Sequence, residues 1–414
     1  MTDLPRDNWP DSTVPLLRSP YEYIPDSARQ LGSDVFGMRL AGRQAYGMTG
    51  RAAAELFYDP RMTRGGAVPG VIRSVLFGPD GVIQGTDGAE HLHRKRQMME
   101  MVERGMVADL GNRLRSGLES ARPGWIAAGE IELFAAMTRV VTIAVCGWAG
   151  VPLPQDEAGA KGRMLAAMFL HAGAASPVEA LRGLRARRQA QAWIEGLMAE
   201  IRDGRTTLPK DAPVARAARW THADGTPLAL DVAAADFLSF LRPNVANAVW
   251  ITHLAHALGT HAGVAGDMTD SGARTMFVRE VRRLYPFFPI LAAVVGEGME
   301  WQGAKLEPGA RAILSLYGTN RDPQVWDAPD TFRPDRHAGR EPGPFDMIPQ
   351  GGGDYFGTHR CAGEWVSIRQ MEVAAEWLGT RLRWRLSDPE ARPSVRTPPG
   401  LPGDGLRLTG LAAR

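Results

Sequence analysis

The chain is poor in cysteine and lysine, and it lacks long apolar runs. Its two cysteines, Cys146 and Cys361, are too few for a disulfide framework, a zinc ribbon or a cysteine-ligated iron–sulfur cluster. The formal net charge of +2 provides no strong field for nucleic acid or an anionic membrane. No stretch approaches the roughly 18 apolar residues of a transmembrane helix, and the N-terminus does not resemble a signal peptide. We therefore expect a cytoplasmic protein without stable membrane insertion and without a nucleic-acid partner.

The composition of the 414 residues, with 44% hydrophobic and 23% charged side chains, is typical of a folded globular protein. Helical periodicity predicts long helices, and Asp87 is a candidate N-cap for the first of them. The helical segments are 87–105, 131–150, 178–202, 231–258, 271–285 and 362–382, and the expected strands are 290–296, 300–302, 311–315 and 383–387, followed by a turn-rich tail. We predict a single domain over residues 1–414, mainly α with a small β portion.

The segment around Cys361 combines a thiol, several glycines and the start of a helix. Helix N-termini lower the pKa of a nearby thiol, and His359 and Arg360 add hydrogen-bond donors beside it. Backbone without side chains can approach a flat ligand closely. The glycines are Gly351, Gly352, Gly353, Gly357 and Gly363. The pattern indicates a metal-bound thiolate, whereas a structural core role is the interpretation for Cys146 in its apolar run.

This segment resembles the haem-binding loop of the cytochrome P450 superfamily, Phe-x-x-Gly-x-Arg/His-x-Cys-x-Gly. Gly357, His359 and Gly363 stand at the expected distances from Cys361, and Asp354 stands where the pattern has phenylalanine. The resemblance implies a haem b with Cys361 as the axial ligand of the iron. It also implies the haem-thiolate triangular-prism fold of that superfamily.

Two further motifs match the same superfamily in order along the chain. Glu280 and Arg283 resemble its Glu-x-x-Arg pair, which at this spacing can form an ion pair on one helix face. Arg336 resembles the arginine that joins the pair. A buried charge triad is costly unless every partner is satisfied. We therefore interpret these three residues as a structural brace for the haem loop and not as catalysts.

In the superfamily a helix contacts the haem propionates, usually through a histidine and a basic residue four positions later. His91 and Lys95 have this spacing, and His359 is a third candidate. The alternative is that HLHRKR is a solvated basic face. A basic residue usually found soon after the Glu-x-x-Arg helix is absent from PFFPILAAVV. The resemblance implies that His91, Lys95 and His359 bind the haem.

The helix expected to cross the haem lacks the acid–alcohol pair that ordinary members use to activate dioxygen. It carries Arg242 and Pro243 in an apolar context instead. Proline inside a helix costs about 3 kcal/mol, and a guanidinium among apolar side chains is costly to bury without an anion. The alternative is that Arg242 reaches water or pairs with an internal glutamate. Two unfavourable residues side by side favour a functional site.

The Arg-Pro pair, with MFVREVRRLYPFFP and FDMIPQGGG, resembles the bacterial fatty-acid peroxygenase branch of the superfamily. The resemblance implies that the substrates are a long-chain fatty acid and hydrogen peroxide, with no redox partner protein. It further implies that Arg242 and Pro243 are catalytic, and that the substrate carboxylate, held by Arg242, acts as the acid–base group. The expected products are α- or β-hydroxy acids.

Three more positions are assigned to the substrate site. In this branch, the position of Gln84 tends to be glutamine in hydroxylating members and histidine in decarboxylating members, so Gln84 favours hydroxylation. Phe77 and Phe288 are candidate channel residues, with a core position as the alternative for each.

Other functions remain open at this point. The chain could be a fatty-acid decarboxylase forming terminal alkenes, or a conventional monooxygenase that depends on a reductase and dioxygen. A haem-binding sensor or carrier, and a helical scaffold without cofactor, are further alternatives. The missing acid–alcohol pair argues against the conventional monooxygenase.

Overall fold

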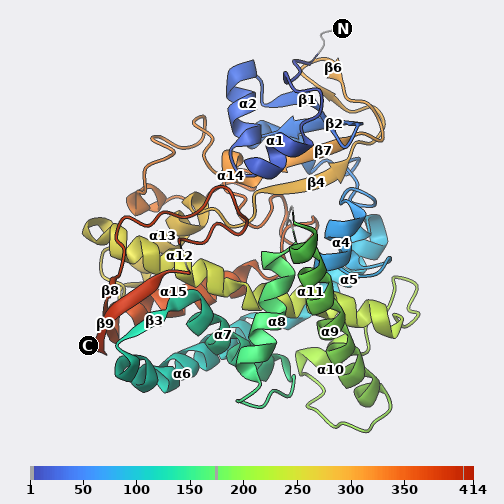
Figure 1. Cartoon of the computed structure of the whole chain (residues 1–414). Coiled ribbons are helices and arrows are strands. Elements are labelled where there is room, and N and C mark those ends of the chain that lie inside the picture. Colours follow the sequence, from blue (N-terminus) through green and yellow to red (C-terminus); the bar gives the residue numbers. More distant parts are fainter. Residues whose placement is uncertain (1–3, 173–175, 404) are drawn as a thin grey trace.

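The computed structural model describes residues 4–172, 176–403 and 405–414, and its larger part is helical (Figure 1). The long helices are α5 (Gly88–Met99), α6 (Arg104–Ala128), α7 (Leu133–Ala149), α8 (Ala158–Leu170), α9 (Pro177–Arg202), α11 (Leu230–Val245), α12 (Asn247–Thr260), α13 (Ser271–Leu284) and α15 (Glu364–Thr380). The shorter ones are α1 (Thr13–Arg18), α2 (Tyr23–Leu31), α3 (Arg51–Phe57), α4 (Gly70–Leu76), α10 (Pro213–Ala217) and α14 (Leu316–Thr319). Single 3₁₀ turns are η1 (Ile83–Gly85), η2 (Glu100–Val102), η3 (Ala262–Val264) and η4 (Pro334–His337).

A four-stranded sheet lies at one end of the molecule, beside α1 and α2 (Figure 1). Its strands, in spatial order, are β1 (Val35–Leu40), β2 (Arg43–Met48), β7 (Arg311–Ser315) and β4 (Ile290–Val294). The β2–β7 pair is parallel, and the β1–β2 and β4–β7 pairs are antiparallel. Because side chains alternate along a strand, Leu314 packs into the core on one face and Ile313 into the core on the other.

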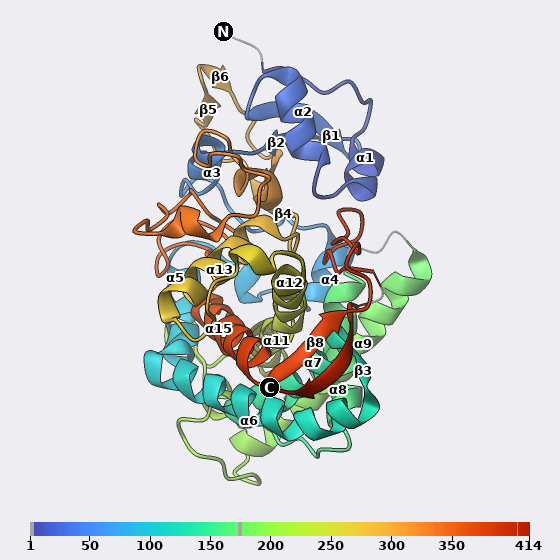
Figure 2. The same cartoon turned by 90° about the vertical axis from the view of Figure 1, so that its left-hand side faces the viewer.

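A second sheet lies at the opposite, helical end, where the chain terminates (Figure 2). Its strands are β3 (Glu130–Glu132), β9 (Arg407–Ala413) and β8 (Leu382–Leu386), all antiparallel. The remaining pair is a short hairpin of β5 (Glu300–Trp301) and β6 (Ala304–Lys305). The sheets therefore flank the helical body at two ends.

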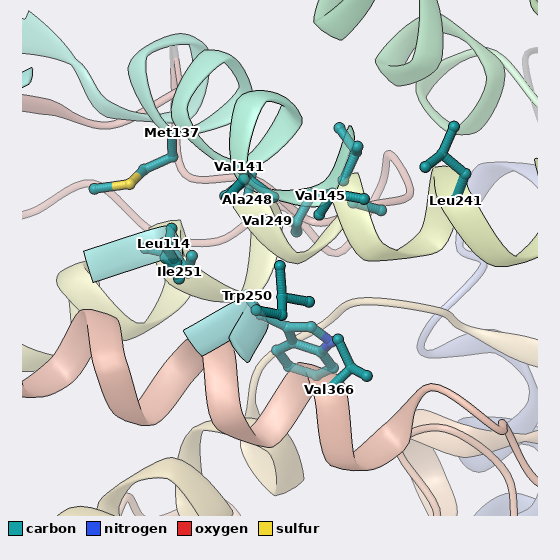
Figure 3. Packing of buried hydrophobic residues seen from close by; sticks show 14 of the residues in the cluster. Leu114, Met137, Val141, Val145, Leu241, Ala248, Val249, Trp250, Ile251 and Val366 are labelled. Carbon is teal, nitrogen blue, oxygen red and sulfur yellow. The ribbon is translucent and has the colours of Figure 1, made fainter. Parts of the chain in front are cut away.

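The main hydrophobic core joins the long helices around α12. Figure 3 shows α12 between α7 and α15, with Trp250 directed toward Val366 of α15. Trp250 is 1% exposed, and such burial stabilises the fold by about 25 cal/mol per Å² of apolar surface. This packing fixes α12 and, through the continuous chain, the preceding helix α11 that crosses the site.

Much of the predicted architecture is confirmed: the chain is mainly α with a small β portion, and β7 has the predicted bounds. The predicted segment 271–285 is α13, whose N-cap Asp270 accepts a hydrogen bond from the Ala273 amide at 2.7 Å. The predicted segment 362–382 is α15.

Some predictions are wrong. The expected helix 231–258 is two helices, because α11 ends at Val245 and α12 begins at Asn247. Pro243 lies in the last turn of α11, and it cannot donate the backbone hydrogen bond that a continuous helix needs. The tail, expected to be rich in turns, also contains strand β9, which was not predicted. Asp87 is the N-cap residue of α5, as predicted, but its side chain makes no capping bond, since its carboxylate accepts from the amides of Arg64 and Gly65 instead.

Within residues 4–172, 176–403 and 405–414, no helix combines the length and the apolar character that crossing a bilayer requires.

Candidate active site

Cys361 lies at the end of the glycine-rich loop, two residues before Gly363, the N-cap of α15. Its amide donates to the Gln350 carbonyl at 3.0 Å, and the Gln350 side-chain amide lies 3.8 Å from the sulfur. Burial raises the pKa of the Cys361 thiol, and the amide of Gly363 only partly opposes the rise. Without a metal, desolvation of the thiol outweighs the helix terminus. A coordinated metal ion reverses this balance by deprotonating a thiol outright.

The glycines of the loop serve two purposes. A Cβ on Gly352 would lie 2.7 Å from the Ile348 side chain, and a Cβ on Gly351, at φ +91°, would lie 2.7 Å from the Tyr58 hydroxyl oxygen. These residues make room for the protein's own atoms and not for a ligand, which corrects the expectation for them. A Cβ on Gly363 would instead face the Cys361 sulfur at 3.8 Å. Gly363 is thus the glycine that keeps the space beside the sulfur open.

Asp354, the departure from the loop pattern, has a local structural role. Its carboxylate accepts hydrogen bonds from the amides of Phe356 at 3.0 Å and Gly357 at 2.6 Å. An aspartate that binds backbone amides two and three residues later stabilises a turn. The substitution therefore shapes the loop just before Cys361.

A cavity of about 290 Å³ separates the Cys361 loop from α11. Much of its wall is apolar, as expected for a small-molecule site with a few polar groups. Its lining residues are Phe77, Ile83, Gln84, His91, Lys95, Met98, Ser239, Phe240, Arg242, Pro243, Asn244, Ala246, Asn247, Phe287, Phe288, Leu291, Leu316, Pro349, Gln350, His359, Arg360, Cys361, Ala362, Gly363 and Ser367. The structure thus brings the predicted thiol, the predicted cation and the predicted substrate positions Phe77, Gln84 and Phe288 to one space.

Arg242 is 4% exposed and lines this cavity with Pro243. Within the described ranges its guanidinium forms no ion pair, and its Nε has no hydrogen-bond partner. Burial lowers the pKa of Arg242 to about 9, and the like charge of Arg187 adds to the decrease. Because Arg242 is buried and pairs with no carboxylate of the described residues, it neither reaches the surface nor pairs with an internal glutamate, the alternative raised from the sequence. A buried cation without a counter-ion implies an anionic ligand.

Other polar atoms in the cavity are also unpartnered. In the part of the chain that the structure describes, Gln84 Oε1, Ser239 Oγ and Asn247 Nδ2 are buried without a hydrogen bond. Such atoms are rare in folded proteins, and each calls for a partner such as water or a ligand. Ser239 and Asn247 were not predicted as site residues, because a serine or asparagine on a helix carries no distinctive sequence signal.

His91, Lys95 and His359 gather on one side of the cavity, with the His91 and His359 ring centroids 3.7 Å apart. The Lys95 ammonium donates to the carbonyls of Thr358 and Arg360, the latter at 2.9 Å. Burial lowers the pKa of Lys95 to about 8 and that of His359 to about 2. The histidines are therefore neutral donors and not cations at pH 7.

A further cation near these residues was missed. The half-buried Arg64 lies 4.3 Å from the Phe57 ring centroid, and its positive charge contributes to the lowered pKa of His359. Asp87 connects the two, since it accepts from the Arg64 amide at 2.9 Å and lies 3.3 Å from His359 Nε2. Arg64 precedes two glycines and lies outside any periodic segment, so no sequence pattern marks it as a site residue.

The three residues of the predicted brace are in contact. Glu280 lies 2.8 Å from Arg283 and 3.1 Å from Arg336, and the pair Glu280–Arg283 is fully buried. His337, which was not predicted, is a fourth member at 2.9 Å from Glu280. Burial alone would raise the pKa of Glu280, but Arg283 and His337 hold it at about 2.

A second buried charge cluster joins the Glu280 helix to the cysteine loop. Glu364, on α15, lies 2.5 Å from Arg282 on α13 and 2.6 Å from Arg360 on the loop. Arg282 also donates to the Gln350 side chain at 3.1 Å. This cluster was missed, because Arg282 lies 82 positions from Glu364 along the chain. It fixes the loop on both sides of Cys361.

These residues fit a thiolate-ligated haem. The sulfur opens to a cavity, neutral histidines and a lysine lie on one side of it, and the loop is held by two charge clusters in which each buried glutamate is paired with two arginines. Together they define a haem-thiolate protein.

The comparisons with known proteins agree. A family model described as cytochrome P450 matches residues 274–402. The solved structure of cytochrome P450SP alpha (CYP152B1) in complex with (R)-ibuprofen is 37% identical, covers 98% of this chain and 99% of its own, and superposes with a TM-score of 0.94. Cytochrome P450EX alpha (CYP152N1) with myristic acid is 32% identical at a TM-score of 0.95, over 100% of both chains.

A variant of cytochrome P450 OleT in complex with arachidonic acid is 27% identical at a TM-score of 0.95, over 100% of this chain and 99% of its own. The matches to curated cytochromes P450 are shorter and span only about a quarter of the length of those proteins, 27% for the relative from Sus scrofa. The chain belongs to the cytochrome P450 family, and its likeness to the CYP152 structures confirms the predicted peroxygenase branch.

Proposed function

We propose that this protein is a fatty-acid peroxygenase, which uses hydrogen peroxide to hydroxylate long-chain fatty acids at the α or β carbon. The observation that carries the proposal is the buried, unpaired Arg242 in the same cavity as Cys361. Two of the similar solved structures contain myristic acid or arachidonic acid, each of which has the carboxylate that Arg242 requires.

The cofactor is a haem b, with Cys361 as the ligand of its iron and His91, Lys95 and His359 as donors to its propionates. Once bound, the haem supplies peroxide activation and the oxidation of a nearby carbon. The two charge clusters around Glu280 and Glu364 hold the loop that carries the thiolate. Residues 1–414 act as one catalytic domain, in the cytoplasm.

Arg242 binds and orients the substrate. Its guanidinium donates charge-assisted hydrogen bonds to the substrate carboxylate, which contribute about 1.5–3 kcal/mol each. The alkyl chain lies along the apolar wall that includes Phe77 and Phe288, where burial contributes about 0.8 kcal/mol per methylene. With the head group fixed and the chain enclosed, the carbons next to the carboxylate are the ones held in position for reaction.

The substrate also supplies the acid–base group. Among the described residues that line the cavity, none is an aspartate or a glutamate. The carboxylate held by Arg242 is therefore the group that accepts a proton from hydrogen peroxide and returns it when water is formed. Because hydrogen peroxide is itself the oxidant and the oxygen donor, no redox partner protein is required. Because the proton carrier arrives with the fatty acid, no proton-delivery side chain is required.

Hydroxylation is the proposed outcome instead of alkene formation because Gln84 lines the cavity with a neutral amide. The side-chain amide of glutamine cannot transfer a proton to the substrate carboxylate, whereas the imidazolium of a protonated histidine at the same position can. Decarboxylation is the second candidate function, because the chain is similar to cytochrome P450 OleT, and the experiment below distinguishes the two products.

Purified protein, mixed with a panel of fatty acids and hydrogen peroxide without reductase, tests the proposal. Mass spectrometry should find α- or β-hydroxy acids. A terminal alkene as the main product would favour decarboxylation. No oxidised product from protein with an intact thiolate–haem spectrum would contradict the proposal.

A further inference from the structure

One buried carboxylate lies where three cavity-lining segments meet. Asp236 is 1% exposed and stands on α11, six residues before Arg242. It does not line the cavity itself, and the proposed reaction does not use it. A carboxylate this deeply buried is costly unless it is fully paired, so its partners show what it holds together.

The first partner is the segment that carries Gln84. Asp236 Oδ1 accepts a hydrogen bond from the Ile83 amide at 2.9 Å. Ile83 is the first residue of the 3₁₀ turn η1, and both Ile83 and Gln84 line the cavity. A shift of this turn relative to α11 would move the Gln84 side chain relative to Arg242.

The second partner is the helix α5. Arg94 is 2% exposed and donates through Nη2 to the other oxygen, Oδ2, of Asp236. On α5 it stands between the proposed haem contacts His91 and Lys95. Arg94 also donates to the Gly81 carbonyl at 2.5 Å, just before the Gln84 turn. The Asp236–Arg94 pair therefore ties the haem side, the Gln84 turn and the Arg242 helix into one unit.

The pair also acts on the charge around Arg242. Arg187 is 4% exposed and close enough to Arg242 to lower its pKa, and Asp236 is among the negative charges that oppose the burial of Arg187. Burial raises the pKa of Asp236, whereas Arg94 and the Ile83 amide stabilise its ionised form. Loss of this negative charge leaves Arg187 with Glu195 and Arg94 with the more distant Glu90 as their remaining negative partners.

We infer that Asp236 and Arg94 form a positioning pair. The pair sets the distance between Arg242, which binds the substrate carboxylate, and the Cys361 side of the cavity, and so selects the α or the β carbon for hydroxylation. This inference rests on the proposed peroxygenase function. Regioselectivity depends on small displacements, because a misplacement of ~1 Å can change a rate by about a hundredfold.

Two single substitutions test the inference. Asp236→Asn keeps an oxygen that can accept from the Ile83 amide but removes the charge that Arg94 requires, and Arg94→Gln removes the other partner. Each variant should bring the ratio of α- to β-hydroxy acid closer to one by about threefold or more, with a smaller change in kcat per folded haem protein. The matched control is Glu376→Gln, which removes an ion pair with Arg115 at 2.9 Å, between α15 and α6 and outside the cavity. It should leave the ratio unchanged.

A measurement independent of turnover completes the test. Hydrogen–deuterium exchange of a peptide covering residues 79–87 should be faster in Asp236→Ala than in the unaltered protein, because the Ile83 amide loses its acceptor. Exchange in α6 should not change.

The results separate the inference from the function on which it rests. An unaltered product ratio in both variants, with only lower thermal stability, would overturn the positioning role and leave the peroxygenase standing. Unaltered exchange over residues 79–87 would overturn it as well. If the unaltered protein forms no hydroxy acid, the peroxygenase fails, and a selective increase in exchange still supports the Asp236 contact between α11 and the Gln84 turn.

Discussion

The two sides of the cavity differ in whether their buried charged side chains are paired. On the Cys361 side, Glu280 and Glu364 are each paired with two arginines, and the loop glycines are packed against protein atoms. On the Arg242 side, the guanidinium has no counter-ion in the described ranges, and polar atoms of neighbouring side chains lack partners there.

The difference follows from what each side holds. A permanent cofactor requires a rigid support. The buried carboxylates of that support are therefore paired with arginines of the protein, and the desolvation cost of these charges is met during folding. A substrate that comes and goes must find open hydrogen-bonding groups, because binding energy comes from partners that the protein leaves unsatisfied. Substitutions on the first side should therefore affect folding and cofactor retention, and substitutions on the second should affect ligand binding.

The largest effect is expected from the axial ligand. Cys361→Ala should abolish turnover and the red-shifted Soret band of the ferrous–CO complex, because no thiolate remains to bind iron. The control is Cys146→Ala, since Cys146 is buried in α7 away from the cavity. If the red-shifted Soret band persisted in Cys361→Ala, the assignment of Cys361 as the iron ligand would be wrong.

The next effect concerns the paired side. Glu280→Gln leaves buried arginines without their counter-ion, so the free energy of unfolding should fall by about 3–5 kcal/mol. Glu341→Gln removes a surface partner of Arg279 and should change stability by about 0–1 kcal/mol. Denaturant titration of both variants measures the difference. Equal stabilities would mean that the cluster around Glu280 is not a brace.

On the open side, Arg242→Ala should weaken fatty-acid binding by about 1.5–3 kcal/mol for each lost hydrogen bond and leave stability the same or higher, since a desolvated cation is removed. The fatty-acid-induced change of the haem spectrum reports the affinity, and Arg242→Lys tests the need for the planar fork. Destabilisation comparable to Glu280→Gln, with binding intact, would contradict the assignment of Arg242 to the open side.

The smallest effect is a pH dependence. Burial lowers the pKa of Arg242 to about 9, so the cation that binds the carboxylate is present below that pH and is lost as the pH rises through it. Fatty-acid affinity should be constant from pH 7 to 8 and should fall by about tenfold per pH unit above 9. Arg242→Gln should show a weak affinity without this decrease. The Soret band at each pH checks that the haem remains bound.

The fold class, the Cys361 loop and the Arg242-Pro243 pair were predictable because each depends on local sequence. Periodicity located α13 and α15, and the isolated Cys361 and the Arg-Pro pair stand out in any reading of the chain. The 25-residue helix α6 was missed because its fully buried stripe is narrow, with Leu110, Leu114 and Leu118 one turn apart.

What could not be predicted depends on contacts between distant segments. Glu364 and Arg282 are 82 positions apart, and Asp236 and Arg94 are 142 apart, so no spacing rule connects them. The pKa of Cys361 also required the structure, because the helix terminus is visible in the sequence whereas the burial that outweighs it is not.

The most direct test of the central claim compares two substrates of equal chain length, a fatty acid and the corresponding primary alcohol, with hydrogen peroxide and no reductase. We expect the acid to be hydroxylated next to its head group and the alcohol not to be turned over, because only the acid gives Arg242 its counter-ion and the reaction its proton carrier. Equal turnover of the alcohol by protein with an intact thiolate–haem spectrum would contradict this claim.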